Sequence, residues 1–537
     1  MPRRTLLSLW RAWPAMLPAA PVAGDEPAPI PDGAGIERIT FERRNIFDLS
    51  KEEENNRLYR WINRLHIMTR ESTVRDQLLF STGDAFDPRL LEESERILRS
   101  NKYFYDVSIT PQLNADGGVD VNVTTRDVWT LNPELSISRS GGANKTIFGF
   151  EESNLFGRGH RILLTRTDDV DRDATTFEFS DRQIRSSWIS IGLRLADTSD
   201  GHSHLLNLVK PFHALDARRS AGVSVFDDDR RSAIYSLGDE AAEYRHQRRL
   251  YSVFGGLSSG LKNGWVRRWT AGIVYDDNRF STALGPTLPA IVPPDRKLVY
   301  PTIGIEILED RFEKTANSDQ IERSEDFYLG TRLSALLGYA STSFDADRNA
   351  WIYALTASGS SGSLSDHALL WSASASGRHD SGSSRNSLVG LDARYYWRQS
   401  DKRLFFILVD AIRGDDLDLD NLVELGGNTG LRGYPLRYQS GDSRVLVSIE
   451  QRYFTDWYPW RLFRIGGAVF FDIGRSWGDN PTGEPNQGWL KDVGVGLRFA
   501  PTRLGTRKVI HLDVAFPLDG DPTIDDLQVL FEAKRSF

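Results

Sequence analysis

The pattern of hydrophobic and polar positions changes near residue 130 of this 537-residue chain. From Leu131 onward, short segments alternate between apolar and polar residues, and clusters of Asp, Asn, Gly and Ser separate them. Such alternation predicts β-strands, because successive side chains of a strand point to opposite faces. A region of about 400 residues built this way predicts a closed, mainly β architecture, since an open sheet of that size would expose long edges. Clear examples are Thr176–Ser180, Ser187–Leu195, Trp269–Tyr275, Ala368–Ser376 and Ser387–Trp397.

The final strands each have one apolar face and one polar face. In Ser443–Phe454, the face with Ile449 opposes the face with Ser448 and Glu450. Charged residues recur in mid-strand on the polar faces, and such groups are too costly to bury in a dry core. We therefore expect the apolar faces to meet lipid and the polar faces to line a wet lumen, as in a transmembrane antiparallel β-barrel over residues 130–537. The same division recurs in Arg464–Gly474, Asp492–Phe499, Val509–Phe516 and Gln528–Phe537.

Residues 36–129 have a different pattern, which predicts a small α+β domain. Ile36–Phe41, Tyr103–Ile109 and Val119–Thr125 alternate as strands, and Asn114–Gly118 supplies a turn between the last two.

Three helices are predicted between these strands. Glu52–Leu65 has helical spacing, and Thr73–Phe80 is a second, shorter candidate. Asp87 is a suitable N-cap for a third helix, with Pro88 at its first position and the helix running through Leu98. The apolar face of the first helix consists of Leu58, Trp61, Ile62 and Leu65.

The first residues predict export from the cytoplasm. Arg3 and Arg4 form a positive region before the short apolar run Leu6–Leu17, and small residues follow it. This order is typical of a signal peptide over residues 1–24, with a linker rich in Pro and Ala over residues 25–35.

Composition excludes several classes of function. The chain has no cysteine, which rules out disulfides, thiolate catalysis and Cys-ligated zinc. Its net charge of −8 disfavours nucleic-acid binding, for which a basic excess is usual. After the first two dozen residues there is no apolar stretch of 18 residues, which disfavours a helical membrane protein. The mean hydropathy of −0.40 is compatible with barrel strands, because their two faces average out.

Several motifs in fixed order resemble the outer-membrane insertase and translocase superfamily of BamA, TamA and the two-partner secretion transporters. The front domain is similar to a single POTRA domain, through the run FSTGDAFDPRLLEESERILRSNKYFYDVSI that follows Leu79. The stretch Gly426–Tyr434, GGNTGLRGY, is similar to the loop-six motif of the family, with Leu431 in the usual Val position. Similar motifs of the barrel are Asn154–Gly159, Phe470–Gly474 and Gly494–Arg498.

The resemblance makes Arg432 the main candidate site residue. Strand parity alone places Glu450 and Asp472 on the inner face of adjacent strands, where a guanidinium from a loop folded into the lumen could bridge both. The family implies this contact, which would lock the loop and hold the barrel's shape. The alternative is that Arg432 is a solvated loop residue and the acids line the lumen wall. Other residues that the resemblance singles out are Gly433, Tyr434, Gly474, Gly496, Arg498 and Phe537.

The strand number is ambiguous. Counting alternating segments gives about fifteen before Gly426 and five after it. The resemblance implies 16 strands, in which case some segments would be loops or halves of longer strands.

The resemblance implies a monomeric barrel in the outer membrane of a Gram-negative bacterium, in contact with lipid, with the POTRA-like domain in the periplasm. It would assist the insertion of outer-membrane proteins or the translocation of polypeptide, with no cofactor and no enzymatic activity. Unfolded clients would bind the POTRA-like domain, whose last strands could accept an extended client strand; the alternative is that the domain merely plugs or tethers the barrel. A passive porin, a surface antigen, a lipid-handling barrel and an outer-membrane enzyme remain alternatives.

Three weaker signals are expected to be structural. Gly256–Gly260, GLSSG, matches the sequence pattern of a nucleophile elbow. Its surroundings, however, predict hairpins rather than the strand followed by a helix that such an elbow needs. His202, His204 and His213 lack a clear metal-binding arrangement. The acidic runs are expected to be solvated loops with weak affinity for divalent cations at most. They are Asp227–Asp229 and the group Asp415, Asp416, Asp418 and Asp420.

Overall fold

The computed structural model describes residues 30–534 apart from 32, 284–290, 480–487, 506–507 and 523. The predicted signal peptide over residues 1–24, most of the predicted linker and Phe537 lie outside the described residues.

The N-terminal domain is a three-stranded sheet covered by helices. In it, β3 (Val119–Asp127) lies between β1 (Ile36–Arg44), to which it is parallel, and β2 (Phe104–Leu113), to which it is antiparallel. Helix α3 (Pro88–Arg99) begins at the predicted N-cap, where the side chain of Asp87 accepts a hydrogen bond from the backbone of Arg89. The other helices are the 3-10 turn Glu52–Glu54, α1 (Arg57–Leu65) and α2 (Glu71–Arg75).

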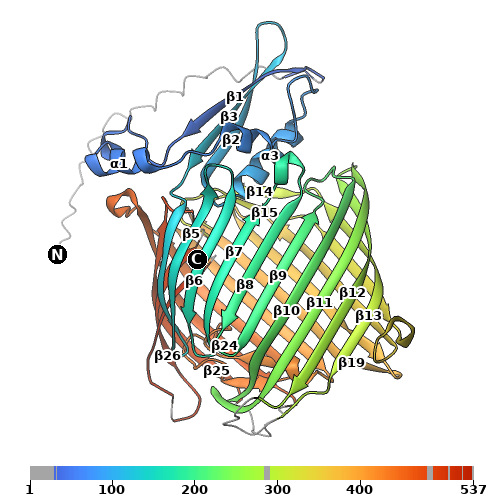
Figure 1. The fold of residues 1–537 in the computed structure, drawn as a ribbon. Helices are drawn as coiled ribbons and strands as arrows, with labels where there is room; N and C mark the ends of the chain where they lie inside the picture. Colours follow the sequence, from blue (N-terminus) through green and yellow to red (C-terminus); the bar gives the residue numbers. More distant parts are fainter. Residues whose placement is uncertain are drawn as a thin grey trace, which may run out of the picture.

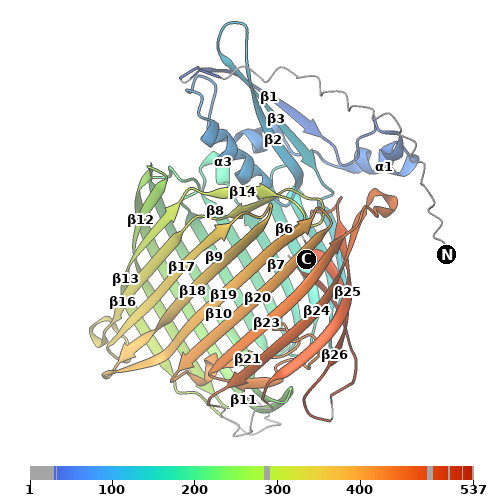
Figure 2. The ribbon, with the colours of Figure 1, turned by 180° about the vertical axis from the view of Figure 1, so that it is seen from behind.

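Twenty strands close the barrel in the part of the chain that the structure describes, and the N-terminal domain lies across one end of it (Figures 1 and 2). The end next to the domain, with the turn Asn263–Gly264, is called here the proximal rim; the opposite end, with the turn Leu237–Gly238, is the distal rim. The strands are β4 (Leu131–Ser140), β5 (Ala143–Leu155), β6 (His160–Asp168), β7 (Asp173–Asp181), β8 (Ser190–Thr198), β9 (Gly201–Lys210), β10 (Arg219–Ser236), β11 (Asp239–Lys262), β12 (Trp265–Ser281), β13 (Arg296–Glu309), β16 (Arg332–Ala340), β17 (Ala350–Gly362), β18 (His367–Asp380), β19 (Ser383–Ser400), β20 (Arg403–Asp415), β23 (Ser443–Phe454), β24 (Phe463–Trp477), β25 (Leu490–Pro501), β26 (Val509–Pro517) and β27 (Gln528–Lys534).

The prediction of 16 strands is wrong. Fifteen described barrel strands, β4 to β13 and β16 to β20, precede Gly426, and five, β23 to β27, follow it. This matches the count of alternating segments, because the segments before and after Gly426 cross the wall as separate strands.

The barrel's outer surface is apolar, as the strand parity predicts. Val469, Val495 and Leu497 are exposed on the outside, whereas Asp472 and Arg498, on the opposite faces of the same strands, are buried inside. Exposed aromatic residues lie near both rims, for example Trp265, Trp397 and Tyr453 at proximal strand ends and Trp351 and Trp477 at distal ones. Two aromatic belts around an apolar band are the signature of a barrel that spans a bilayer. No helix within the described residues is long and apolar enough to cross a membrane.

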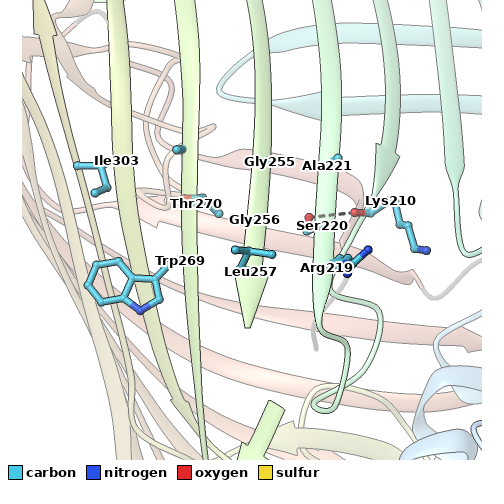
Figure 3. A pocket seen from close by; sticks show the side chains of 11 residues that line it. Lys210, Arg219, Ser220, Ala221, Gly255, Gly256, Leu257, Trp269, Thr270 and Ile303 are labelled. Carbon is cyan, nitrogen blue, oxygen red and sulfur yellow. Dashed lines mark hydrogen bonds between the residues drawn. The ribbon is translucent and has the colours of Figure 1, made fainter. Parts of the chain in front are cut away.

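A hollow of about 630 Å³ indents the outer surface of the wall (Figure 3). The small residues Ala221, Gly255 and Ala271 lie opposite one another on β10, β11 and β12, and the larger Leu257 and Trp269 flank them. The hollow therefore gives membrane lipid an uneven surface to pack against.

Two segments fold inward from the rims. The first, called the lumen loop, is residues 416–442 between β20 and β23; it contains the short strands β21 (Val423–Leu425) and β22 (Gln439–Gly441). The second, called the rim hairpin, is residues 310–331 at the proximal rim, with β14 (Phe312–Thr315) and β15 (Glu325–Tyr328).

Candidate functional site

Arg432 of the lumen loop lies between two adjacent barrel strands, where the sequence placed its partners. Its Nε and Nη2 donate to the two carboxylate oxygens of Asp472, each at 2.7 Å, and its Nη1 donates to Glu450 Oε1 at 2.8 Å. Nη2 also reaches the hydroxyl of Ser448 at 2.9 Å, and the guanidinium lies 3.5 Å from the ring centre of Phe470. We call this group the arginine lock.

The arginine lock is almost closed to water. Arg432 is 5 % exposed and Asp472 is not exposed at all. The inward charges at this point are therefore covered by the loop and neutralise one another. Buried charges of this kind are tolerated only when they are paired and hydrogen-bonded.

Further ion pairs extend the arginine lock toward the proximal rim. Arg452 donates to Glu450 Oε2 at 2.8 Å and to the backbone carbonyl of Ser318 in the rim hairpin at 3.0 Å. Arg498, which the sequence singled out, pairs with Asp513 on the next strand. The sequence did not identify Ser318 as a partner, because no local signal tells which segment enters the lumen.

Glycines and one tyrosine let the lumen loop approach the wall. A Cβ on Gly433 would lie 2.7 Å from Asp492 Cβ, and the Gly433 N–H donates to Asp492 Oδ2 at 3.0 Å. Gly496 is needed for the Arg498–Asp513 pair, since a Cβ there would overlap the Asp513 carboxylate. The Tyr434 hydroxyl donates to the carbonyl of Lys491 in β25 at 2.8 Å. Gly474 makes room in a similar way, because its Cβ would lie 3.2 Å from Leu425 of the loop.

A second anchor of the lumen loop lies on the other side of the barrel. Arg437 binds both carboxylate oxygens of Asp171, in the turn between β6 and β7, at 2.7 and 2.5 Å. The backbone N–H of Leu436 donates to the carbonyl of Gly141, in the turn between β4 and β5, at 3.3 Å. The loop thus holds β23 and β24 through Arg432 and the first strands of the barrel through Arg437.

These two anchors lie on opposite sides of the barrel's seam, where β27 meets β4. Phe531 opposite Arg139 is the one pairing described between these strands. By contrast, β26 pairs with β27 without interruption from Val509–Lys534 to Ala515–Gln528. Among the described residues, the seam is therefore the junction with the fewest paired positions, and the lumen loop spans it from inside.

The N-terminal domain is tied to the barrel by ion pairs. Arg99 of α3 binds both oxygens of Asp326 in the rim hairpin at 2.8 and 2.7 Å. Arg503, in the turn before β26, donates to Glu54 at 2.6 Å. These contacts hold the domain in a defined position over the proximal rim.

A buried carboxyl lies at the junction between domain and barrel. Asp127 accepts hydrogen bonds from the N–H and hydroxyl of Thr69 at 2.7 and 2.9 Å, and Asn154 of β5 donates to that hydroxyl at 2.8 Å. Burial nevertheless raises the pKa of Asp127 to about 7. Burial also lowers the pKa of His66, 3.8 Å away, to about 4, so this pair is not an ion pair at neutral pH.

The sheet of the N-terminal domain offers a client one free edge, and it is not the predicted one. The last strand, β3, is central and has no edge. The outer edge of β2 is occupied, because Glu95 accepts from the Ile109 N–H and Arg99 donates to the Val107 carbonyl. Among the described residues, the edge of β1 from Arg38 onward has no such backbone partner.

The weaker signals fall in structural positions. Gly256–Gly260 lies within β11, and β12 follows it through a turn instead of a helix. His202 stacks on His204, while His213 stacks on Trp188. No group of three or more acidic or His residues that could hold a metal ion occurs in the described part of the chain.

The prediction that the acidic runs are solvated loops is wrong for Asp227–Asp229, Asp418 and Asp420, whereas Asp415 and Asp416 are exposed. Asp227–Asp229 lies within β10. Asp418 pairs with Arg296 at 2.8 Å and with Arg378 at 2.6 Å, and Asp420 also pairs with Arg296. The reason is that the lumen loop folds inward, where these acids meet arginines of the wall.

Comparison with known proteins gives matches to both parts of the chain. Residues 66–126 match the family model described as POTRA, surface antigen variable number repeat. The outer membrane protein assembly factor BamA of Neorickettsia risticii is 26 % identical over 175 residues, which cover 32 % of this chain and 23 % of that protein. The chain thus spans about a quarter of the length of this curated relative.

Two solved structures also resemble the chain. BamA from Haemophilus ducreyi lacking POTRA domains 1–3 has a TM-score of 0.37 and 12 % identity, covering 92 % of this chain and 84 % of that one. CdiB from Acinetobacter baumannii has a TM-score of 0.46 and 13 % identity, covering 93 % and 73 %. With its POTRA match, its sequence similarity to BamA and its closed barrel, this chain is an outer-membrane protein that joins a POTRA domain to a β-barrel.

Proposed function

We propose that this protein assists the insertion of other polypeptides into the outer membrane, with its POTRA domain in the periplasm and the seam of its barrel as the insertion point. The observation that carries the proposal is the sparse pairing of β27 with β4. When this seam opens, both strands present unpaired N–H and C=O groups, and such edges are templates for an incoming strand.

The lumen loop would control the seam. It is anchored to β23 and β24 by Arg432 and to the turn before β7 by Arg437, so the closed seam is held from inside. Release of either anchor would remove this support without breaking the pairing of any other two strands. An open diffusion pore is disfavoured, because the loop and the rim hairpin both occupy the lumen.

The POTRA domain would receive clients on the edge of β1, which lacks a partner from Arg38 onward in the described chain. An extended polypeptide could pair there by adding a strand to the sheet. The relative from Neorickettsia risticii is named an assembly factor for outer-membrane proteins, which agrees with this role. The proposed role is non-catalytic and needs no cofactor, because the folding of the client in lipid would supply the driving force.

Depletion of the protein, followed by quantitative proteomics of the outer membrane and of the culture medium, tests this function. Loss of several other barrel proteins from the membrane, reversed by a wild-type copy, is the expected result. Loss of one secreted protein alone would point instead to a dedicated exporter. An unchanged membrane and secretome would leave a passive role, and either outcome would contradict the proposal.

A further inference from the structure

Helix α1 has an apolar face that no other part of the described protein covers. Leu58, Trp61 and Leu65 are 58 %, 57 % and 50 % exposed, although their spacing places them together on one side of the helix. The helix packs on the domain through a different side, on which Tyr59 is buried and Ile62 contacts the cluster around it. The exposed face is therefore available for a partner outside the domain.

A row of positive charge borders this face. Arg57, Arg60 and Arg64 are exposed and follow one another at spacings of three and four, so they form a stripe beside Trp61. The helix contains no acidic residue. Exposed Leu and Trp next to an uninterrupted basic stripe are typical of a helix that lies in a membrane interface with anionic lipid.

The helix is located where a membrane surface would be. Both ribbon views show α1 beyond the edge of the barrel, beside the proximal rim on the side of β25 and β26 (Figures 1 and 2). The hydroxyl of Tyr59 on α1 hydrogen-bonds to the backbone carbonyl of Trp460, in the rim turn between β23 and β24. Trp460 is 75 % exposed, and Trp457 in the same turn is also exposed.

Through Tyr59, α1 contacts the rim turn that carries the exposed Trp457 and Trp460. Trp side chains gather at the level of lipid headgroups, because one end of the ring is apolar and the other is polar. We propose that α1, together with Trp457 and Trp460, rests in the headgroup layer next to the proximal rim and binds anionic phospholipid. The three arginines contact the phosphates, while Leu58, Trp61 and Leu65 enter the upper acyl region.

Lipid is favoured over a client polypeptide by the position of the face and by its charge. Helix α1 lies beside the rim of the lipid-facing wall, whereas the free edge of β1 belongs to the sheet (Figure 1). This inference is independent of the proposed insertion function, since a lipid-anchored domain would serve an exporter or a porin equally well.

A nitroxide probe tests the placement directly, because the natural chain has no cysteine. Leu65→Cys carries the label on the apolar face. Leu113→Cys carries it at the exposed end of β2, opposite the end at which Phe104 contacts Arg323 of the rim hairpin. Both full-length proteins are reconstituted in nanodiscs of phosphatidylcholine with phosphatidylglycerol. Accessibility to oxygen and to a water-soluble nickel complex is then measured by EPR.

The label at position 65 should show severalfold lower access to nickel and higher access to oxygen than the label at position 113. Combining Leu65→Cys with Arg57→Gln, Arg60→Gln and Arg64→Gln, or omitting phosphatidylglycerol, should move the label toward water while the barrel keeps its folded mobility on gels. Equal water access at positions 65 and 113 would overturn the proposal. So would burial that needs added client polypeptide, or spin–spin broadening that reports a second copy.

Discussion

Arg432 makes four hydrogen bonds to Asp472, Glu450 and Ser448 in a site that water barely reaches. A lysine could not replace it, because one ammonium cannot make a two-point contact with a carboxylate and a further contact with a second acid in the same plane. The residue therefore joins the loop to two strands at once.

Replacement of Arg432 by alanine should destabilise the folded barrel by about 3–5 kcal/mol, since Asp472 would stay buried without its guanidinium partner and Glu450 would keep only Arg452. The loss is measured as a lower urea midpoint for unfolding in micelles. Arg166, whose pair with Asp173 is exposed, is the matched control, and Arg166→Ala should cost under about 1 kcal/mol. Adding Asp472→Asn to Arg432→Ala should restore part of the stability, because it removes the unpaired buried charge. Equal stability of Arg432→Ala and the wild-type protein would show that the arginine lock does not stabilise the barrel.

Asp127 should make the junction of domain and barrel sensitive to pH. Its pKa is about 7 in the folded protein and about 4 in an unfolded chain, so the folded state binds the proton more tightly. Its contribution to stability is complete below about pH 4 and is lost as the pH rises through about 7.

Against Asp127→Asn, the wild-type domain should thus lose stability between about pH 4 and 7, by up to about 1.4 kcal/mol per pH unit. A fluorophore on Leu113→Cys follows unfolding of the domain in urea. The lowered pKa of His66 has the opposite effect, because its contribution to stability is lost as the pH falls from about 6.5 through about 4. This contribution is the same in the wild-type protein and in Asp127→Asn, so it cancels in the comparison. A difference between the variants that does not change with pH would refute the assignment.

At the scale of single residues, the sequence predicted the inward faces of β23 and β24, and therefore Glu450 and Asp472 as partners of Arg432. It could not predict Ser318 as a partner of Arg452 or Asp171 as a partner of Arg437, because these contacts join segments more than 100 positions apart. Such contacts depend on how the lumen loop and rim hairpin fold back, and hydrophobic periodicity carries no information about that.

Among the elements, strands were predicted better than helices. Alternation marks each barrel strand because one face meets lipid, and the resulting count was more reliable than the number carried by family resemblance. Helix α1 begins at Arg57, later than the predicted Glu52, because Glu52–Glu54 forms a separate 3-10 turn and Asn56 caps the helix. The rim hairpin was missed, since its polar sequence is indistinguishable from that of a solvated loop.

The order of strands in the N-terminal sheet also required the structure. Alternation identifies β1, β2 and β3 but not which one is central. Parallel pairing of β1 with β3 leaves β1 as the free edge, which moves the expected client site to the opposite side of the domain.

In the whole molecule, one loop spans the one sparsely paired junction described in the wall. The POTRA domain, the rim hairpin and the arginine lock are connected by Arg99–Asp326 and by Arg452, which joins Ser318 to Glu450. These contacts form a connected path from the domain to the loop that spans the seam.

The most direct test is to fix the seam with a disulfide. Arg139 and Phe531 lie opposite each other on antiparallel strands, a geometry with a Cα separation of about 4.5–5.5 Å that suits a disulfide. Arg139→Cys with Phe531→Cys should abolish insertion of client barrels into proteoliposomes when oxidised and restore it on reduction. Val514→Cys with Val529→Cys, which staples β26 to β27 beside the seam, should have no effect. Full insertion activity with the Arg139–Phe531 position cross-linked would contradict the account.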